Sequence, residues 1–256
     1  MVDCYEHFTA VAPVYTRLRT TDASPVKAIR DNLVKTDGLY VADIGCGSGR
    51  YSQQLFLHLG PAIKLVCVDV NRAMLDELNW AIDPAMDPSV ESIQASANAL
   101  PFDDGTLDVI TTFNAIHHFD VAGFLRESRR VLKKDGKVFL YTRLMEQNAT
   151  TIWGRFFPGF LEKETRLYTR SELSTYISRH LMPSQMLITP FSFYRQASLE
   201  ALVEQAKLRH YSTFSLYGEK EFEYSLGEFE RGVGQAYLNL GRVLWTESYT
   251  LFTLTR

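Results

Sequence analysis

The chain has 256 residues, 46% of them hydrophobic, a length and apolar content that suit one large α/β domain or a domain with a modest insertion. Its 27 Lys and Arg against 30 Asp and Glu give a formal net charge of −3, which excludes a strong overall attraction to nucleic acid or to an anionic membrane. The three cysteines, Cys4, Cys46 and Cys67, include no CxxC pair, so the sequence supports neither a disulfide framework nor a metal site.

The first ten residues, MVDCYEHFTA, carry acidic side chains and no apolar signal segment. No stretch of the chain approaches 18 uninterrupted apolar residues, the length that a membrane-spanning helix needs. We therefore expect a cytoplasmic protein that does not associate with membranes. Its oligomeric state is left open between a monomer and a homodimer.

Seven apolar runs along the chain predict β-strands. Five of them, at residues 39–44, 64–69, 90–95, 107–113 and 137–143, recur at intervals of roughly 20 to 30 residues with helical patterns between them. This spacing is typical of βαβ units and of a parallel sheet. The runs at 186–194 and 247–256 alternate polar and apolar residues, as antiparallel strands do. The sequence thus predicts an α/β fold with a mostly parallel seven-stranded sheet and helices on both of its faces.

Helix signals fall between these strands. Residues 71–81 begin at Asn71 and residues 120–132 begin at Asp120, and both residue types are good helix caps. Thr169 and Glu172 have the spacing of a capping box before a further helix.

Residues 195–246 separate the last two predicted strands and have a helical pattern. Their apolar side chains recur every three or four positions, at Phe222, Leu226, Phe229, Val233, Tyr237, Leu240 and Leu244. We interpret this segment as a helical insertion that forms a lid or cap on a domain made of residues 1–194 and 247–256. A helix that only faces the core, without contact to a substrate, explains the same pattern equally well.

The stretch VADIGCGSGR, residues 41–50, places Gly45, Gly47 and Gly49 directly behind the first strand. A strand, a glycine loop and a helix bring backbone N–H groups close to a ligand, because glycine has no Cβ to block the approach. A dinucleotide fingerprint would read GxGxxG, but its sixth position here is Arg50. A P-loop would need Lys and then Ser or Thr after the last glycine, and this chain has Arg50 and Tyr51. Both patterns therefore disagree with this loop.

Two acidic residues favour a particular ligand. Asp43, just before the loop, would repel a pyrophosphate and attract an ammonium group. Asp69, at the end of the second strand, can accept hydrogen bonds from both hydroxyls of a ribose. S-adenosylmethionine has an ammonium group, a ribose and no phosphate. Met74, in the following helix, either packs on the adenine of such a ligand or belongs to the core.

Four blocks in order, VADIGCGSGRY, CVDVNRAML, ANALPFDDGTLDVITTFNAIHHF and RVLKKDGKVFLYTR, resemble the class I S-adenosylmethionine-dependent methyltransferases. The resemblance covers about residues 39 to 143 and is greatest to the branch of ubiquinone/menaquinone and other small-molecule methyltransferases. The upstream VAPVYTRLR resembles the segment of that family whose tyrosine closes over the cofactor, here Tyr15.

The resemblance implies a Rossmann-like methyltransferase sheet and a set of cofactor-binding residues. The loop and Asp43 would hold the methionine end, Asp69 the ribose, and Ser96 with Ala97 the adenine, while Asn114 would face the methionine. Ser96 departs from the family, which usually has aspartate there, so affinity would depend more on backbone groups. The full set is Tyr15, Asp43, Gly45, Cys46, Gly47, Gly49, Asp69, Val70, Met74, Ser96, Ala97 and Asn114.

Methyl transfer from a sulfonium needs mainly positioning, so a base is optional. His117 and His118 follow the fourth strand, at the sheet edge where ligands bind, and are the candidate catalytic residues; either can instead cap a loop. The segment 152–169 follows the fifth strand, where Trp153, Phe156, Phe157 and Phe160 could line an acceptor pocket. Arg155 or Arg166 could then hold an acidic group of the substrate. A buried aromatic cluster with surface arginines explains these residues equally well.

The sequence therefore predicts an enzyme that methylates a small, partly hydrophobic acceptor. A tRNA wobble-uridine methyltransferase is the first alternative, and a non-catalytic binding or regulatory protein with the same fold is the second. The (N/D)PP(Y/F) motif of nucleobase amino-group methylation is missing from NAIH, residues 114–117. We expect no nucleic-acid partner, because acidic residues crowd the inserted segment at Glu219, Glu221, Glu223, Glu228 and Glu230.

Overall fold

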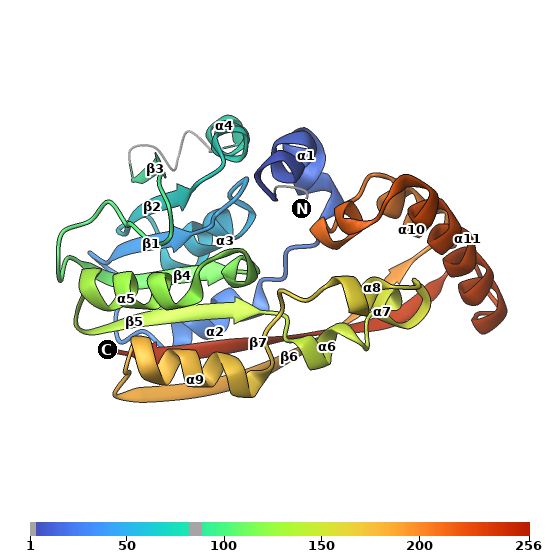
Figure 1. Ribbon diagram of the computed structural model, residues 1–256. Helices are drawn as coiled ribbons and strands as arrows, with labels where there is room; N and C mark the ends of the chain where they lie inside the picture. Colours follow the sequence, from blue (N-terminus) through green and yellow to red (C-terminus); the bar gives the residue numbers. More distant parts are fainter. Residues whose placement is uncertain (1–3, 82–88) are drawn as a thin grey trace.

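The seven predicted strands form one sheet in the order β3-β2-β1-β4-β5-β7-β6, which confirms the predicted fold class (Figure 1). The computed structural model describes residues 4–81 and 89–256. The strands are β1 Tyr40–Ile44, β2 Lys64–Asp69, β3 Val90–Gln94, β4 Leu107–Phe113, β5 Leu132–Thr142, β6 Gln185–Ala197 and β7 Val243–Thr255. All neighbours among β1 to β5 pair in parallel, and β7 runs antiparallel to both β5 and β6. The strand order reverses between β1 and β4, so a crevice for ligands is expected at their carboxyl ends.

The last two strands are longer than the sequence predicts. They pair with each other without interruption from Gln185 opposite Thr255 to Ala197 opposite Val243. The pairing thus takes in residues 195–197 and 243–246, which the sequence assigns to the insertion, because each strand supplies hydrogen-bond partners to the other. The segment between the two strands is residues 198–242.

Helices cover both faces of the sheet. The helices α2 Ser24–Asp31 and α3 Arg50–Leu59 pack on one face, and α5 Val121–Val131 with α9 Arg170–His180 pack on the other. The helix α4 Arg72–Ala81 packs against α1 Cys4–Leu18.

Among the described residues, two of the three predicted helix caps form their side-chain hydrogen bonds, and the third does not. Asn71 Oδ1 accepts a hydrogen bond from the Met74 N–H at 3.1 Å, and Thr169 with Glu172 forms the expected capping box. Asp120 does precede α5, but its side chain makes no capping hydrogen bond within the described chain.

A second layer of helices lies over the far end of the long β6–β7 hairpin (Figure 1). After β5 come α6 Met145–Asn148, α7 Ile152–Phe156 and α8 Phe160–Lys163. Between β6 and β7 come α10 Leu199–Lys207, the 3-10 helix η2 Ser212–Leu216 and α11 Glu219–Ala236. A further 3-10 helix, η1 Ile116–His118, follows β4.

The apolar face predicted for α11 is used for packing in this layer. Phe222, Leu226, Phe229 and Val233 are buried in one cluster with Trp153, where the rings of Trp153 and Phe229 stack 4.8 Å apart. The core-facing interpretation is therefore right for these side chains, since they are already covered by protein. Two positions of the predicted face lie outside the helix and are exposed, Leu240 at 40% and Leu244 at 50%.

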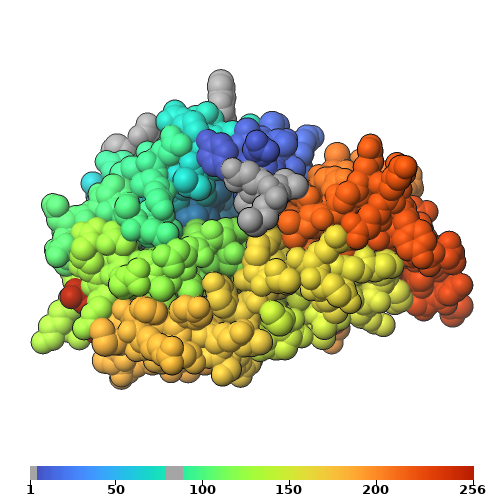
Figure 2. Space-filling model, viewed as in Figure 1, coloured from blue at the N-terminus to red at the C-terminus, as the bar shows by residue number. Residues whose placement is uncertain are grey.

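The helix α1 bridges the two parts of the molecule. It contacts α4 on one side and η2 on the other, and Figure 2 shows this blue helix between the cyan and orange segments. His7 of α1 forms a hydrogen bond through Nδ1 to the Ser215 hydroxyl at 2.6 Å. Over residues 4–81 and 89–256, no helix is long and apolar enough to cross a membrane.

Candidate functional site

The glycine loop at the end of β1 has the backbone shape that its glycines permit. Gly45, Gly47 and Gly49 have φ values of 70°, 55° and 77°, which disfavour any residue with a side chain. A Cβ on Gly45 would lie 2.6 Å from the Ala115 Cβ, so this glycine is needed for close packing. A Cβ on Gly47 would meet no atom of the described residues within 4 Å. The loop therefore leaves open space beside Gly47.

Asp69 connects this loop to the end of β2. Its carboxylate accepts hydrogen bonds from the backbone N–H groups of Gly47 and Asn71, each at 2.8 Å. Burial raises the pKa of the Asp69 carboxyl, although these backbone hydrogen bonds oppose the shift. Each carboxylate oxygen retains a further lone pair, so Asp69 can still accept hydrogen bonds from a ligand.

Asp43 is buried, with 1% of its surface exposed. Its two oxygens accept hydrogen bonds from the hydroxyls of Ser52, at 2.6 Å, and Thr111, at 2.9 Å. Burial raises its pKa to about 7, and the two hydrogen bonds oppose that rise. A cationic ligand group beside this carboxylate would stabilise its charged form, because a nearby opposite charge lowers the pKa of an acid.

These residues line a cavity of about 400 Å³, which we name the first cavity. Its wall includes eleven of the twelve residues predicted to bind a cofactor: Tyr15, Asp43, Gly45, Cys46, Gly47, Asp69, Val70, Met74, Ser96, Ala97 and Asn114. The twelfth, Gly49, lies at the start of α3 with the Leu78 side chain against its Cα, so its role is to pack helix α3 against α4. Phe8 and Arg50 also line this wall and were not predicted from the sequence.

Two wall residues meet the expectations only in part. Met74 is 2% exposed and packs on Val11 and Ala12 of α1, so it belongs to a small core cluster and to the cavity wall at once. The Ser96 hydroxyl accepts a hydrogen bond from the Asn98 N–H at 3.2 Å, so it is already engaged by the loop.

A third wall residue, Asn114, has a positive φ of 53° in the turn after β4, a conformation that asparagine tolerates better than most residues.

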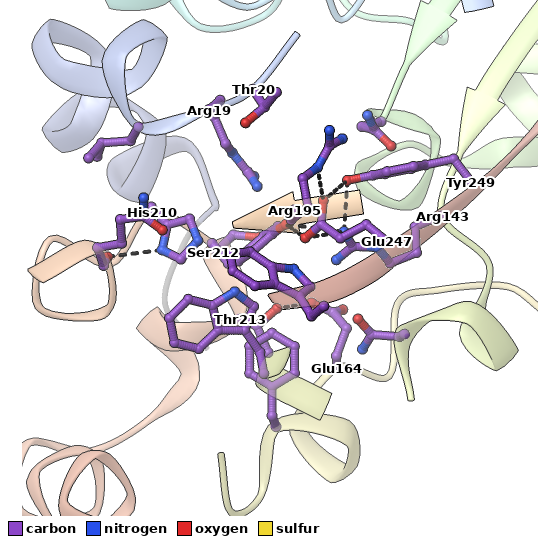
Figure 3. A pocket seen from close by; sticks show the side chains of 18 of the residues that line it. Arg19, Thr20, Arg143, Glu164, Arg195, His210, Ser212, Thr213, Glu247 and Tyr249 are labelled. Atoms are coloured by element: carbon purple, nitrogen blue, oxygen red, sulfur yellow. Dashed lines mark hydrogen bonds and ion pairs between the residues drawn. The ribbon is translucent and has the colours of Figure 1, made fainter. Parts of the chain in front are cut away.

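A second cavity, of about 160 Å³, adjoins the first, and the two share the side chains of Tyr15, Arg50, Tyr51 and Asn114. Residues 152–169 contribute Trp153, Phe160, Glu164 and Leu167 to its wall, and the segment between β6 and β7 contributes Gln205, His210, Tyr211, Ser212 and Thr213. Figure 3 shows these segments and the sheet strands facing one another around the cavity. The acidic residues of α11 and its apolar face do not line it.

The arginines and Phe156 predicted for an acceptor pocket lie elsewhere. Arg155 is exposed and covers the Phe156 ring, 5.0 Å from its centroid, and neither residue lines the cavity. Arg166 is also outside the wall and forms an ion pair with Glu164 at 2.5 Å. Trp153 does line the cavity, and it also packs in the buried cluster that contains Phe229 of α11.

Four other arginines line the second cavity: Arg19, Arg50, Arg143 and Arg195. Arg143 donates hydrogen bonds to the hydroxyls of Tyr211, at 3.1 Å, and Tyr249, at 2.8 Å. It also forms an ion pair with Glu247 at 3.3 Å. One sequence signal could have identified Arg143, because it directly follows the fifth strand at the edge of the sheet where ligands bind.

The two candidate histidines point to different cavities. His117 lines the second cavity and His118 lines the first, and their ring centroids are 4.1 Å apart. Burial, together with the charges of Arg166, Arg19 and Arg143, lowers the pKa of His117 to about 3. Burial and the neighbouring His117 lower the pKa of His118 as well. Both imidazoles are therefore neutral near pH 7, and both Nδ1 atoms are buried without a hydrogen-bond partner in the described chain.

Residues 42–140, the strands and loops around the first cavity, match a family described as a methyltransferase domain. The ubiquinone/menaquinone biosynthesis C-methyltransferase of Hahella chejuensis is 32% identical over 123 residues, 47% of this chain and 46% of that protein. The tRNA (carboxymethyluridine(34)-5-O)-methyltransferase alkbh8 of Xenopus tropicalis is 26% identical over 166 residues, 60% of this chain and 24% of that protein. The chain thus spans less than half the length of these curated relatives.

Solved structures share the fold over nearly the whole chain. A protein of Anabaena variabilis ascribed to an antibiotic biosynthesis pathway has a TM-score of 0.70 at 22% identity and covers 93% of this chain and 99% of its own. The geranyl diphosphate C-methyltransferase of Streptomyces coelicolor, solved with S-adenosyl-L-homocysteine, has a TM-score of 0.55 at 18% identity, covering 91% of this chain and 75% of its own.

Proposed function

Because the chain belongs to the class I S-adenosylmethionine-dependent methyltransferases, we propose that it transfers a methyl group from S-adenosylmethionine to a small, partly hydrophobic acceptor. The observation that carries this proposal is the wall of Tyr15, Arg50, Tyr51 and Asn114 common to both cavities. A cofactor in the first cavity and an acceptor in the second would meet at that wall.

The first cavity fits the cofactor in size and in chemistry. Its volume of about 400 Å³ lies within the roughly 300–1,000 Å³ that is usual for small-ligand sites. The open space beside Gly47 is a cradle that a Cβ would fill. Asp43 would face the ammonium group, Asp69 the ribose hydroxyls, and Arg50 the carboxylate of the methionine end.

S-adenosylmethionine would supply a methyl group on a sulfonium, and its sulfur would keep the electron pair of the carbon–sulfur bond as the methyl group passed to a nucleophilic atom of the acceptor. The acceptor would release its proton to bulk solvent as the product leaves. The protein's own contribution is to position the two reactants and to exclude water from the space between them. Positioning alone is worth roughly 7–11 kcal/mol in well-oriented reactions.

His117 orients the acceptor in this proposal. With a pKa of about 3, it is a weak base near pH 7, but its neutral ring can form a hydrogen bond to an acceptor group. The aromatic side chains of the wall, Trp153, Phe160, Tyr211 and Trp245, support an acceptor with an apolar part.

Turnover tests the proposal and separates an enzyme from a non-catalytic binding protein. Purified protein is incubated with methyl-labelled S-adenosylmethionine and a small-molecule metabolite extract, and labelled products and S-adenosylhomocysteine are measured. We expect label transfer by the wild type and much less by the Asp69→Ala variant when S-adenosylmethionine is below saturation. Cofactor binding without label transfer to any extract would favour the binding protein.

Methylation of a tRNA wobble uridine is a second candidate, favoured by the similarity to the Xenopus tropicalis enzyme. Such binding would need several Lys or Arg contacts to phosphates, and its affinity would fall steeply with salt. We expect no specific tRNA retention at physiological salt. Submicromolar tRNA affinity with a steep negative salt slope would instead support this candidate.

A further inference from the structure

We propose that the acceptor carries an anionic oxygen group, a carboxylate or a phosphate, that binds to Arg19 in the second cavity. This inference rests on the proposed function, because it concerns the acceptor of that same reaction. It replaces the sequence-based expectation that Arg155 or Arg166 holds such a group.

The other charges around the cavity are paired. Asp22 accepts two hydrogen bonds from Arg195, at 2.9 and 2.5 Å, and both side chains are nearly buried. Glu247 lies between Arg143, at 3.3 Å, and Arg195, at 3.2 Å.

Glu164, the remaining acid of the wall, is held by Arg166 and by the Thr213 hydroxyl, each at 2.5 Å. The acids near the cavity are therefore all engaged by cations other than Arg19 and Arg50.

Arg19 and Arg50 form no ion pair with a carboxylate of the described residues. Arg50 lines both cavities and donates to the Thr20 carbonyl at 3.0 Å and the Thr21 hydroxyl at 2.7 Å. This position suits the single carboxylate of the cofactor. Arg19 lines only the second cavity, so its charge remains for the acceptor.

Aromatic rings hold Arg19 in place without neutralising it. Its guanidinium lies 4.0 Å from the centroid of the Tyr211 ring and 5.4 Å from that of Tyr15. Ring faces attract a cation without neutralising it. The Tyr15 hydroxyl also interacts with the guanidinium groups of Arg19 and Arg50, which lower its pKa against the opposing effect of burial, but the Nε donor of Arg19 keeps no partner among the described residues. Figure 3 shows the Arg19 side chain pointing from the end of α1 toward the region of Arg195 and Glu247.

Several hydrogen-bond donors in the wall of the second cavity have no partner in the described chain. The Nε atoms of Arg19 and Arg143 and the Nε1 atom of Trp245 are buried and have no hydrogen-bond partner among the described residues. All three groups can only donate. Buried donors without partners are costly, and an anionic oxygen group is the ligand chemistry that best satisfies several of them.

The experiment measures binding of small acids to the protein saturated with S-adenosylhomocysteine. Calorimetry compares benzoate and phenyl phosphate with benzamide, which has a similar ring and no charge. The variants are Arg19→Gln and Arg19→Lys, with Arg155→Gln as the matched control on the exposed surface. S-adenosylhomocysteine affinity is titrated separately for each protein and for Arg50→Gln.

We expect one of the two acids to bind the wild type and Arg155→Gln at least ~10-fold more tightly than benzamide, since hydrogen bonds to charged groups contribute that much. Preference for benzoate or for phenyl phosphate identifies the group as a carboxylate or a phosphate. Arg19→Gln should lose this preference and Arg19→Lys should keep part of it. Their S-adenosylhomocysteine affinity should stay within ~3-fold of wild type, in contrast to Arg50→Gln.

Equal binding of benzamide and the acids, no binding of either acid, or an acid preference retained by a folded Arg19→Gln variant would each overturn the inference. So would a loss of S-adenosylhomocysteine affinity in Arg19→Gln as large as in Arg50→Gln, because Arg19 would then hold the cofactor. Failure of the wild type to bind S-adenosylhomocysteine would instead refute the proposed function itself.

Discussion

The Asp69 carboxylate accepts a hydrogen bond from the Gly47 N–H at 2.8 Å, which fixes the middle of the glycine loop to the end of β2. Two residues that are 22 positions apart in the chain thus form one side of the first cavity. The same carboxylate has lone pairs left for two hydroxyl groups, so it can support the loop and bind a ribose simultaneously.

Replacement of Asp69 by alanine should weaken S-adenosylhomocysteine binding by ~3 kcal/mol, about a hundredfold, because two hydrogen bonds of ~1.5–3 kcal/mol each are lost and partly replaced by water. Calorimetry measures the change. Asp76→Ala is the matched control, since Asp76 is exposed and forms an ion pair with Arg72 at 2.9 Å on the helix surface. Unchanged affinity in Asp69→Ala would place the ribose elsewhere.

Alanine at Gly45 and at Gly47 should have different effects, although both glycines have positive φ. Gly45→Ala should lower the free energy of unfolding by more than 2 kcal/mol, because backbone strain adds to the clash with Ala115. Gly47→Ala should cost about 1 kcal/mol of stability and should weaken S-adenosylhomocysteine binding, because its Cβ fills the cradle. Urea unfolding and calorimetry measure both effects. Equal stability losses would contradict the assignment of Gly45 to close packing and of Gly47 to the ligand cradle.

The first cavity could be predicted from sequence because its residues lie in short local motifs. Glycines or an acidic residue that directly follow a parallel strand must lie at the carboxyl edge of the sheet, so their position can be predicted from the strand pattern. The second cavity could not be predicted in this way. Arg19 and Arg195 reach it from opposite ends of the chain, and the register that sets Arg195 opposite Trp245 emerges only from strand pairing.

The two arginines predicted from their place after the fifth strand, Arg155 and Arg166, do not line the second cavity. Arg155 follows that strand closely, but the short helix α7 directs it to solvent while Trp153 of the same helix faces inward. Arg166 is taken by Glu164, two residues before it. Which of several nearby cations remains unpaired depends on such tertiary contacts, and a sequence pattern does not encode them.

The pair of Asp22 and Arg195 should contribute strongly to stability, because their side chains are 12% and 13% exposed. Asp22→Ala leaves the nearly buried Arg195 guanidinium with Glu247 as its one carboxylate partner among the described residues. We expect a loss of about 3 kcal/mol in the free energy of unfolding, the lower end for such pairs. Glu228→Ala, which removes the exposed pair with Arg231, should cost less than about 1 kcal/mol. Denaturant unfolding distinguishes the two.

Stability should fall in mild acid because buried histidines are neutral in the folded protein. Burial and the nearby arginines lower the pKa of His117 to about 3, against 6.5 in an unfolded chain. Below pH 6.5 the unfolded state therefore binds more protons, and stability is lost as the pH falls from 6.5 toward 3. Between pH 7.5 and 5.5 this histidine should cost about 1 kcal/mol. His117→Gln should reduce the loss by that amount in thermal unfolding, and an identical pH dependence in both proteins would argue against a buried neutral ring.

The most direct measurement is a calorimetric titration of the purified protein with S-adenosylhomocysteine, and with NAD and ATP in parallel. Asp43 lies directly before the glycine loop in the wall of the first cavity, where its charge would repel a phosphate of NAD or ATP, and the loop carries neither nucleotide pattern. We predict saturable binding of one S-adenosylhomocysteine per chain and no binding of NAD or ATP. Tighter binding of NAD than of S-adenosylhomocysteine would contradict the assignment of this cavity to S-adenosylmethionine.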